Sequence, residues 1–237
     1  YAIRFMEVLE EKNEALPDLQ IGLFGAETFS DAMKQKISAG LGIEVFDIYG
    51  MTETGGVGTL GMDCAAHEGI HVWEDHYIVE ILDPETGELC ADGELGELVV
   101  TSLSLQALPI VRFRTGDITR IVSRDTCACG RTHVRIAPLM GRADDMLVIK
   151  GVNFFPNQVE EFLMEIPGVG SAYQIVIEET DGIKELRVNV EAESGVTWYD
   201  VQKRLREALG FTCKGEVLPI GTLPRAEGAK ANRVIKS

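Results

Sequence analysis

The pattern of apolar and polar positions predicts alternating helices and short strands over the first fifty residues. Apolar residues recur at helical spacing from Tyr1 onward, and a second helix is expected after Ser30, whose hydroxyl is suited to cap a first turn. Short apolar runs predict strands at Ile21–Phe24 and Val45–Tyr49, and a glycine-rich loop follows. This succession is typical of part of an α/β sheet with functional loops at the strand ends.

From Ile70 onward, the pattern changes to that of an antiparallel β region. Four segments are expected to be strands: Tyr77–Leu82, Gly96–Thr101, Val111–Phe113 and Ile118–Val122. The first two are separated by a turn that contains Pro84 and Gly87, residue types that favour chain reversal.

After Gly141, the pattern predicts a small α+β unit. One helix is expected to open at Pro156, and another follows Thr197, which resembles a capping box with Asp200. The strands expected in this unit are Ala172–Ile177, Leu186–Glu191 and a last one near Val217.

The segment Gly141–Asn153 lies where the pattern changes. A basic residue, Arg142, and two adjacent carboxylates form a charged turn, which an apolar strand and a Lys-Gly turn follow. Such a turn is a domain pivot, an anion site or an ordinary solvated loop. The two domains expected on either side are residues 1–140 and residues 141–237.

Composition and charge narrow the classes of partner. The formal net charge of −16 argues against non-specific binding to nucleic acid or to an anionic membrane, because both need a basic surface. No apolar run is long enough to span a bilayer. The five cysteines are too few for a disulfide framework and favour a reducing cytoplasm. Because helical periodicity starts at the first residue, without an initiator methionine, we expect a piece of a longer chain.

Two loops carry candidate chemistry. Tyr49-Gly50-Met51-Thr52-Glu53 combines an aromatic ring, a hydroxyl and a carboxylate at a strand end, a set that can stack on a purine, bind phosphate and hold Mg²⁺. Arg112–Asp117 adds a carboxylate that can accept hydrogen bonds from both hydroxyls of a ribose. The alternative for each is an ordinary polar turn.

A separate group of residues has the composition of a metal site. Cys127 and Cys129 form a compact knuckle, and Cys64 lies upstream with His67 or His71. Three thiolates and one imidazole would make a closed tetrahedral Zn²⁺ site. The alternative for Cys64 is a small buried apolar residue.

In chain order, Tyr49–Glu53, Arg112–Asp117 and Gly141–Asn153 resemble the motifs of adenylate-forming ligases. Further segments, including Trp73-Glu74-Asp75-His76 and Gly151–Pro156, are similar in sequence to the phenylacetate–CoA ligase branch of that family. The resemblance runs over the whole chain but covers only the second half of such an enzyme, without the family's earlier phosphate loop. It implies an α/β plus α+β fold, in which the C-terminal part of a large AMP-binding domain precedes a small mobile domain.

The resemblance also implies a two-step reaction with ATP, Mg²⁺ and CoA. An aromatic acid, phenylacetate or a close analogue, forms an acyl-adenylate and then a CoA thioester. The residues it assigns to the nucleotide and metal are Gly25, Ala26 and Glu27 for adenine, Tyr49, Gly50 and Met51 around the ring, Thr52 for phosphate, Glu53 for Mg²⁺ and Asp117 for ribose. It further brings Arg142 toward the nucleotide, makes Asp144 the hinge and turns Gly151 toward the CoA channel.

A lysine near the C-terminus steadies the adenylation transition state in this family. The matching residue here is Lys230, although Ala229 intervenes where the family has lysine directly after glycine. The alternative for Lys230 is a solvated terminal lysine. The resemblance also favours His71 over His67 as the fourth metal ligand, and a homodimer is kept as an open expectation.

Two further readings remain open. One is a non-catalytic module that binds a nucleotide or CoA and is stabilised by a structural zinc site. The other is adenylation with a carrier-protein thiol as the acceptor.

Overall fold

The computed structural model describes residues 1–26, 30–56, 58–180, 183–224 and 233–236, and the chain forms two compact units. The first unit is made of Tyr1–Leu16, Phe29–Leu41 and Met146–Ser237, and the second is made of Pro17–Thr28 and Gly42–Asp145. The second unit ends at Asp145, inside the charged turn. The expected domains, residues 1–140 and 141–237, stay a prediction.

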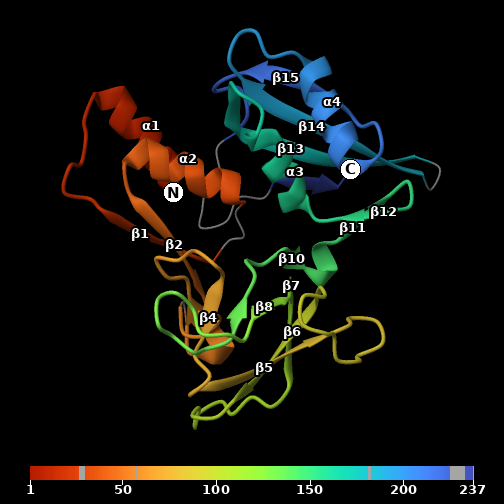
Figure 1. The fold of residues 1–237 in the computed structure, drawn as a ribbon. Coiled ribbons are helices and arrows are strands. Elements are labelled where there is room, and N and C mark those ends of the chain that lie inside the picture. The colour runs from red at the N-terminus through yellow and green to blue at the C-terminus, as the bar shows by residue number, and fades with distance from the viewer. Residues whose placement is uncertain (27–29, 57, 181–182, 225–232, 237) are drawn as a thin grey trace. The chain divides into compact units, whose positions relative to one another are not determined.

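The second unit contains a six-stranded sheet (Figure 1). Its strands are β1 (Ile21–Phe24), β2 (Glu44–Tyr49), β3 (Gly61–Met62), β4 (Ile70–Val72), β8 (Ile121–Ser123) and β9 (Arg135–Ile136). They follow the order β1-β2-β3-β4-β9-β8, with β1 and β2 parallel and the other pairs antiparallel. The strands expected at Ile21–Phe24 and Val45–Tyr49 are therefore present as β1 and β2. The short strands β3, β4 and β9 were not predicted.

A second sheet in this unit is wholly antiparallel. Its strands are β5 (Tyr77–Leu82), β6 (Gly96–Ser102), β7 (Phe113–Thr119) and β10 (Gly141–Arg142). They follow the order β10-β7-β6-β5. Leu98 and Val100 of β6 are buried in a core that also contains Ile70 and Ile136 from the six-stranded sheet and Leu60, which directly precedes β3.

The sequence prediction differs from the structure around β7. Strands were expected at Val111–Phe113 and Ile118–Val122, with a loop between them, but β7 runs through that loop. Arg112 has a φ of +47°, which keeps the chain out of the strand until Phe113. The glycine and aspartate that suggested a loop lie within the strand, at an irregularity in its pairing with β6.

The first unit contains an α+β layer with one further pair of helices. Its helices are α1 (Ala2–Lys12), α2 (Asp31–Leu41), α3 (Pro156–Met164) and α4 (Trp198–Leu209). Its strands are β11 (Leu147–Ile149), β12 (Val152–Phe154), β13 (Val169–Thr180), β14 (Ile183–Ala192), β15 (Lys214–Pro219) and β16 (Val234–Lys236). The larger sheet has the order β15-β14-β13-β16, and β11 pairs with β12 as a hairpin.

Local sequence signals explain where these helices begin and end. The hydroxyl of Ser30 accepts a hydrogen bond from the backbone N–H of Met33 at 3.2 Å, so Ser30 caps α2 as predicted. Thr197 and Asp200 form the predicted capping box of α4, and Gly210 ends that helix with a φ of +78°.

One apolar face of the larger sheet is covered by α3 and α4. Alternate residues of β13 and β14 are buried together with apolar residues of both helices: Tyr173, Ile175, Ile177, Leu186, Val188, Val190, Val159, Leu163, Val201 and Leu205. The strand β16, parallel to β13, was not expected from the sequence. Within the described ranges, no helix has the length and apolar character that a bilayer crossing requires.

Candidate functional site

The end of β2 presents a buried aromatic side chain. Tyr49 is buried and is the last residue of the strand, and Gly50 follows it. A Cβ on Gly50 would lie 2.3 Å from the carbonyl oxygen of Gly56, so the loop can close back on itself only with glycine there. The Tyr49 hydroxyl donates a hydrogen bond to Oδ2 of Asp117 at 2.5 Å.

Asp117 and Arg142 lie beside Tyr49, and we call these three residues the ribose cluster, after the ligand that the sequence predicts for Asp117. Asp117 of β7 pairs with Arg142 of β10, and Nη1 of Arg142 lies 3.6 Å from Oδ1 of Asp117. The same Nη1 donates to the carbonyl oxygen of Thr115 at 3.2 Å. The structure therefore brings together an aromatic ring, a carboxylate and a guanidinium that are far apart in the sequence.

Burial fixes the protonation state of Tyr49. Desolvation of the phenol raises its pKa above the usual range, and the nearby charge of Asp117 raises it further. The hydroxyl therefore keeps its proton at neutral pH and acts as the hydrogen-bond donor to Asp117. The other two side chains of the cluster are more exposed than Tyr49. That of Asp117 is 16% exposed, and that of Arg142 is 50% exposed.

The loop after Tyr49 forms a short 3₁₀ turn, Thr52–Thr54. The side chain of Thr54 ties this turn together, because its hydroxyl accepts from the backbone N–H of Met51 at 3.1 Å. The two side chains predicted to act on phosphate and Mg²⁺ take no part in that hydrogen bond. Thr52 is exposed, and Glu53 is half-buried.

The predicted adenine segment follows β1. A Cβ on Gly25 would lie 2.4 Å from the carbonyl oxygen of Ile48, so glycine lets the end of β1 approach β2 closely. Ala26 has a φ of +71°, a left-handed conformation that alanine rarely adopts, and it is exposed. Glu27 lies outside the described residues.

The remaining predicted nucleotide and CoA residues are spread over both units. Asp144 is exposed in the 3₁₀ turn Ala143–Asp145, where its Oδ1 accepts from Nε of Arg142 at 3.0 Å. Gly151 is exposed at the turn of the β11–β12 hairpin, with a φ of +79°. Lys230 lies outside the described residues.

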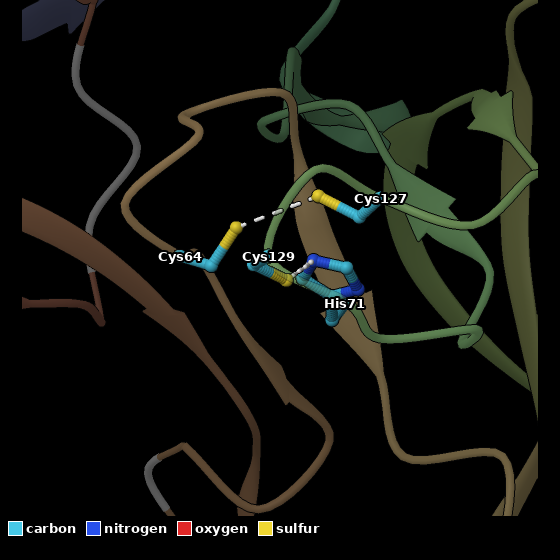
Figure 2. A group of neighbouring side chains, drawn as sticks. All are labelled: Cys64, His71, Cys127 and Cys129. Carbon is cyan, nitrogen blue, oxygen red and sulfur yellow. Dashed lines mark hydrogen bonds between the residues drawn. The ribbon is translucent and has the colours of Figure 1, made fainter.

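The predicted metal ligands come together in the second unit, and we call them the thiol cluster (Figure 2). One ligand atom from each of Cys64, His71, Cys127 and Cys129 lies within 4.8 Å of the others. Sγ of Cys64 is 3.7 Å from Sγ of Cys127, and Sγ of Cys129 is 3.5 Å from Nε2 of His71. Three separate segments build the cluster: the chain after β3, strand β4, and the loop between β8 and β9.

The thiol cluster lies among groups that affect ionisation. Burial raises the pKa of the Cys64 thiol to about 11. Hydrogen bonds from the backbone and the guanidinium of Arg131 lower the pKa of Cys129 to about 7. Burial lowers the pKa of His71, which keeps its imidazole neutral at pH 7.

The other histidine considered as a ligand has different partners. Nδ1 of His67 lies 2.8 Å from Oδ2 of Asp63, and its Nε2 lies 3.3 Å from Oε1 of Glu44. The geometry therefore groups His71, not His67, with the thiols. Cys90 and Cys213 are free thiols outside the cluster.

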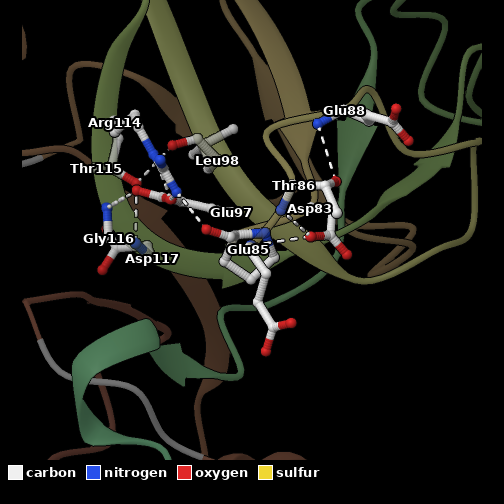
Figure 3. Close-up of polar contacts among 11 residues, drawn as sticks. Asp83, Glu85, Thr86, Glu88, Glu97, Leu98, Arg114, Thr115, Gly116 and Asp117 are labelled. Atoms are coloured by element: carbon white, nitrogen blue, oxygen red, sulfur yellow. Dashed lines mark hydrogen bonds and ion pairs between the residues drawn. The ribbon is translucent and has the colours of Figure 1, made fainter.

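Sequence reasoning missed two residues that contact the segment carrying Asp117 (Figure 3). Glu97 is buried, and its Oε1 accepts from the backbone N–H of Gly116 at 3.0 Å. The hydroxyl of Thr115 accepts from the backbone N–H of Asp117 at 3.0 Å. A signal for Glu97 was available: it directly precedes the apolar run Leu98–Val100, and a carboxylate buried in such a strand needs partners.

Comparisons with known proteins identify the families whose sequences this chain matches. The family described as AMP-binding enzyme matches residues 2–106, and the AMP-binding enzyme C-terminal domain matches residues 151–237. The chain therefore matches both domain families of the AMP-binding enzymes, in the order large domain and then C-terminal domain.

Within this class, the chain is similar to phenylacetate–coenzyme A ligases. It is 38% identical to the Thermus thermophilus enzyme over 239 residues, covering 92% of this chain and 54% of that protein. It is 36% identical to the Escherichia coli K12 enzyme over 248 residues, covering 99% of this chain and 55% of that protein. The chain thus spans about half the length of these relatives, and the resemblance read from its motifs is confirmed.

A solved structure confirms the fold class. The chain matches 2-hydroxyisobutyryl-CoA ligase, in complex with 2-HIB-AMP in the postadenylation state, with a TM-score of 0.90 and 27% identity. The match covers 100% of this chain and 53% of that structure.

Proposed function

We propose that the chain is the C-terminal part of an acid–thiol ligase. This enzyme activates an aromatic carboxylic acid, phenylacetate or a close analogue. In the first step, a carboxylate oxygen attacks the α-phosphorus of ATP, which gives an acyl-adenylate and releases pyrophosphate. In the second step, the thiolate of CoA attacks the acyl carbon, which gives a thioester and releases AMP. The ribose cluster carries this proposal, in a chain similar to phenylacetate–coenzyme A ligases.

The ribose cluster is suited to fix the nucleoside. The ring of Tyr49 would pack on adenine, beside backbone from Gly25–Glu27 and Gly50-Met51. The carboxylate of Asp117 would accept hydrogen bonds from the two ribose hydroxyls, because its two oxygens are acceptors only. Arg142 would add positive charge next to the phosphates.

The chemical step needs charge neutralisation at the phosphates. Mg²⁺ supplies this by drawing electron density from the phosphate oxygens, and Glu53 would hold it while Thr52 contacts phosphate. Lys230 would stabilise the charge that develops on the α-phosphate during adenylation. Asp144 would act as the pivot of a domain rotation between the two steps, and Gly151 would border the path of the CoA thiol.

A substrate-dependent isotope exchange tests the proposal. The purified chain is incubated with ATP, labelled pyrophosphate, Mg²⁺ and phenylacetate, with hexanoate as the matched aliphatic acid. The proposal expects phenylacetate-dependent label in ATP, either from this chain or from the longer protein that contains it. No exchange from either protein contradicts it.

Two other outcomes of that experiment favour the competing functions. Exchange followed by transfer to a carrier-protein thiol, with none to CoA, favours a carrier as the acceptor. Nucleotide binding without exchange in both proteins favours a non-catalytic binding module, for which the closed thiol cluster is the supporting observation.

We also infer that the thiol cluster holds a structural Zn²⁺. At tetrahedral angles, Zn–S bonds of about 2.3 Å separate two sulfurs by about 3.8 Å, and a Zn–N bond of about 2.0 Å separates sulfur from nitrogen by about 3.5 Å. The distances of 3.7 Å and 3.5 Å in the cluster match both values. Four protein ligands would leave no coordination site for substrate, so the ion would join the segments that carry them.

Metal analysis tests the zinc assignment. We expect about one zinc per chain in the unmodified protein and a large loss in Cys127→Ser. Cys90→Ser is the matched control, because Cys90 lies outside the cluster, and it should retain the metal. Zinc-free preparations of both the unmodified protein and the control contradict the assignment.

We further propose a reducing, cytoplasmic location and a homodimer. The five cysteines, all within the described residues, form no disulfide with one another, which supports the first. Fractionation of cells that produce the protein tests the location, and light scattering of the purified protein tests the dimer.

A further inference from the structure

Strand β7 contains a bulge at the position of Asp117. Along β6, the pairing passes from Glu97 opposite Ile118 to Val99 opposite Arg114, so two steps on β6 correspond to four on β7. Three residues of β7, Thr115–Asp117, therefore lie opposite the single residue Leu98 of β6, a surplus of two. Bulges of this kind interrupt the ladder of hydrogen bonds and redirect a side chain.

A bulge leaves backbone N–H groups that the neighbouring strand does not satisfy, and buried N–H groups need acceptors. Here, side chains supply them (Figure 3). The N–H of Gly116 donates to Oε1 of Glu97 at 3.0 Å, and the N–H of Asp117 donates to the hydroxyl of Thr115 at 3.0 Å. That hydroxyl in turn donates to the carbonyl oxygen of Leu98 at 2.9 Å, so the bulge is joined to β6 at two points.

Glu97 is built into the sheet as a fixed acceptor. It is 5% exposed, and Nε of Arg114 donates to its Oε2 at 2.7 Å, with Nη2 of Arg114 as a second donor. Nη2 also donates to the carbonyl oxygen of Pro84 at 3.0 Å. A buried carboxylate is costly without such partners, so this network holds the acceptor in one place.

We propose that Glu97 is a positioning residue that sets the specificity of the site for ribonucleotides over deoxyribonucleotides. It acts through the Gly116 N–H, which fixes the bulge and so points the carboxylate of Asp117 toward the two ribose hydroxyls. Glu97 itself contacts no nucleotide. The inference rests on the proposed role of Asp117 in binding ribose.

The test compares Glu97 with a matched ion pair on the same sheet. Glu80 of β5 pairs with Arg112 through two hydrogen bonds of 3.0 and 3.1 Å, away from the bulge. The variants are Glu97→Ala and Glu97→Gln, with Glu80→Ala as the control. Thermal unfolding first confirms that each variant is folded, and Glu97→Gln replaces Glu97→Ala where the latter is not.

Two readouts separate positioning from stability. Amide hydrogen exchange at Gly116 and Asp117 reports the bulge, and calorimetric titration with AMP and 2′-deoxy-AMP reports ribose specificity. We expect exchange at Gly116 to accelerate at least about tenfold in the Glu97 variant, beyond any change at Val100, where a uniform loss of stability would also appear. The preference for AMP should fall by about tenfold, a loss of about 1.4 kcal/mol. Glu80→Ala should change neither.

The two readouts also distinguish the failure of this inference from failure of the proposed function. Unchanged exchange at Gly116 overturns the role of Glu97. Faster exchange with an unchanged preference for AMP overturns it as a specificity determinant. If the unmodified chain shows no preference for AMP, the assignment of Asp117 to ribose is wrong, while accelerated exchange would still establish Glu97 as the residue that holds the bulge.

Discussion

The thiol cluster and the ribose cluster lie in the same unit and are both assembled from distant segments, yet they differ in how they face solvent. In the thiol cluster, the ligand atoms face one another within 4.8 Å, and three of the four residues are buried. In the ribose cluster, exposure rises from 8% for Tyr49 to 50% for the side chain of Arg142. The first arrangement is closed and suits a structural ion, whereas the second is open on one side and suits a ligand that comes and goes.

This difference predicts separable consequences of mutation. Changes in the thiol cluster should mainly alter the free energy of unfolding, and changes in the ribose cluster should mainly alter nucleotide affinity. A variant that reverses this division would show that one of the two assignments is wrong.

The largest effect is expected for Cys127→Ser, because it removes one of the four ligands. We expect the melting temperature to fall by about 10 °C, since metal-linked stability is large and each kcal/mol shifts the Tm of a chain this size by about 2–4 °C. Differential scanning calorimetry measures the shift. Cys90→Ser is the control, and a Cys127→Ser protein as stable as that control would contradict a structural metal.

A smaller effect, and one that isolates affinity from stability, is expected for Gly116→Ala. Gly116 has a φ of +78°, and a Cβ there would lie 2.7 Å from Nη2 of Arg142, which must move away. Gly87→Ala is the matched control, because Gly87 has a φ of +73° but no atom within 4 Å of the added Cβ.

Both alanine variants should lose about 1–2 kcal/mol of stability from the left-handed backbone. AMP affinity, measured by calorimetry, should fall only in Gly116→Ala, by about fivefold to tenfold, the scale of one ordinary hydrogen bond. Equal AMP affinity in the two variants would show that Arg142 does not contribute to nucleotide binding.

These features differ in how far the sequence could predict them. The caps at Ser30 and Thr197 are local, because each side chain bonds to backbone within three residues, and both were predicted correctly. The bulge at Thr115–Asp117 depends on Glu97, which is distant in the sequence, so a Gly-Asp pair alone indicated only a loop. Strand β16 was missed because it has only three residues and forms by pairing with β13.

The candidate sites show the same contrast. The identities of the four thiol-cluster residues followed from spacing and resemblance, but only folding determines that His71 faces the thiols while His67 pairs with Asp63 and Glu44. The roles of the ribose-cluster residues and of Lys230 stay predictions.

The smallest effect is expected from high pH acting on Tyr49. Because its pKa is raised in the folded state above the ordinary value of about 10, the folded chain binds this proton more tightly than the unfolded chain does. The contribution to stability is complete below pH 10 and declines above it. Between pH 8 and pH 11, the unmodified chain should lose about 1 kcal/mol more unfolding free energy than Tyr49→Phe.

Denaturant unfolding at the two pH values measures this difference. The substitution leaves every other tyrosine in place, so their ionisation cancels in the comparison. Equal losses in the two proteins would mean that Tyr49 does not keep its proton through burial beside Asp117.

The assignment of the ribose cluster to nucleotide is tested most directly by titrating AMP into the unmodified chain and into Asp117→Asn, with zinc content measured on the same samples. A hydrogen bond to a charged acceptor contributes about 1.5–3 kcal/mol, so AMP affinity should fall by about 10-fold to 150-fold in the variant. Zinc content should stay the same, and the melting temperature should fall by less than in Cys127→Ser, because Asp117 also accepts the hydrogen bond of Tyr49. An Asp117→Asn protein that binds AMP as tightly as the unmodified chain would contradict the assignment.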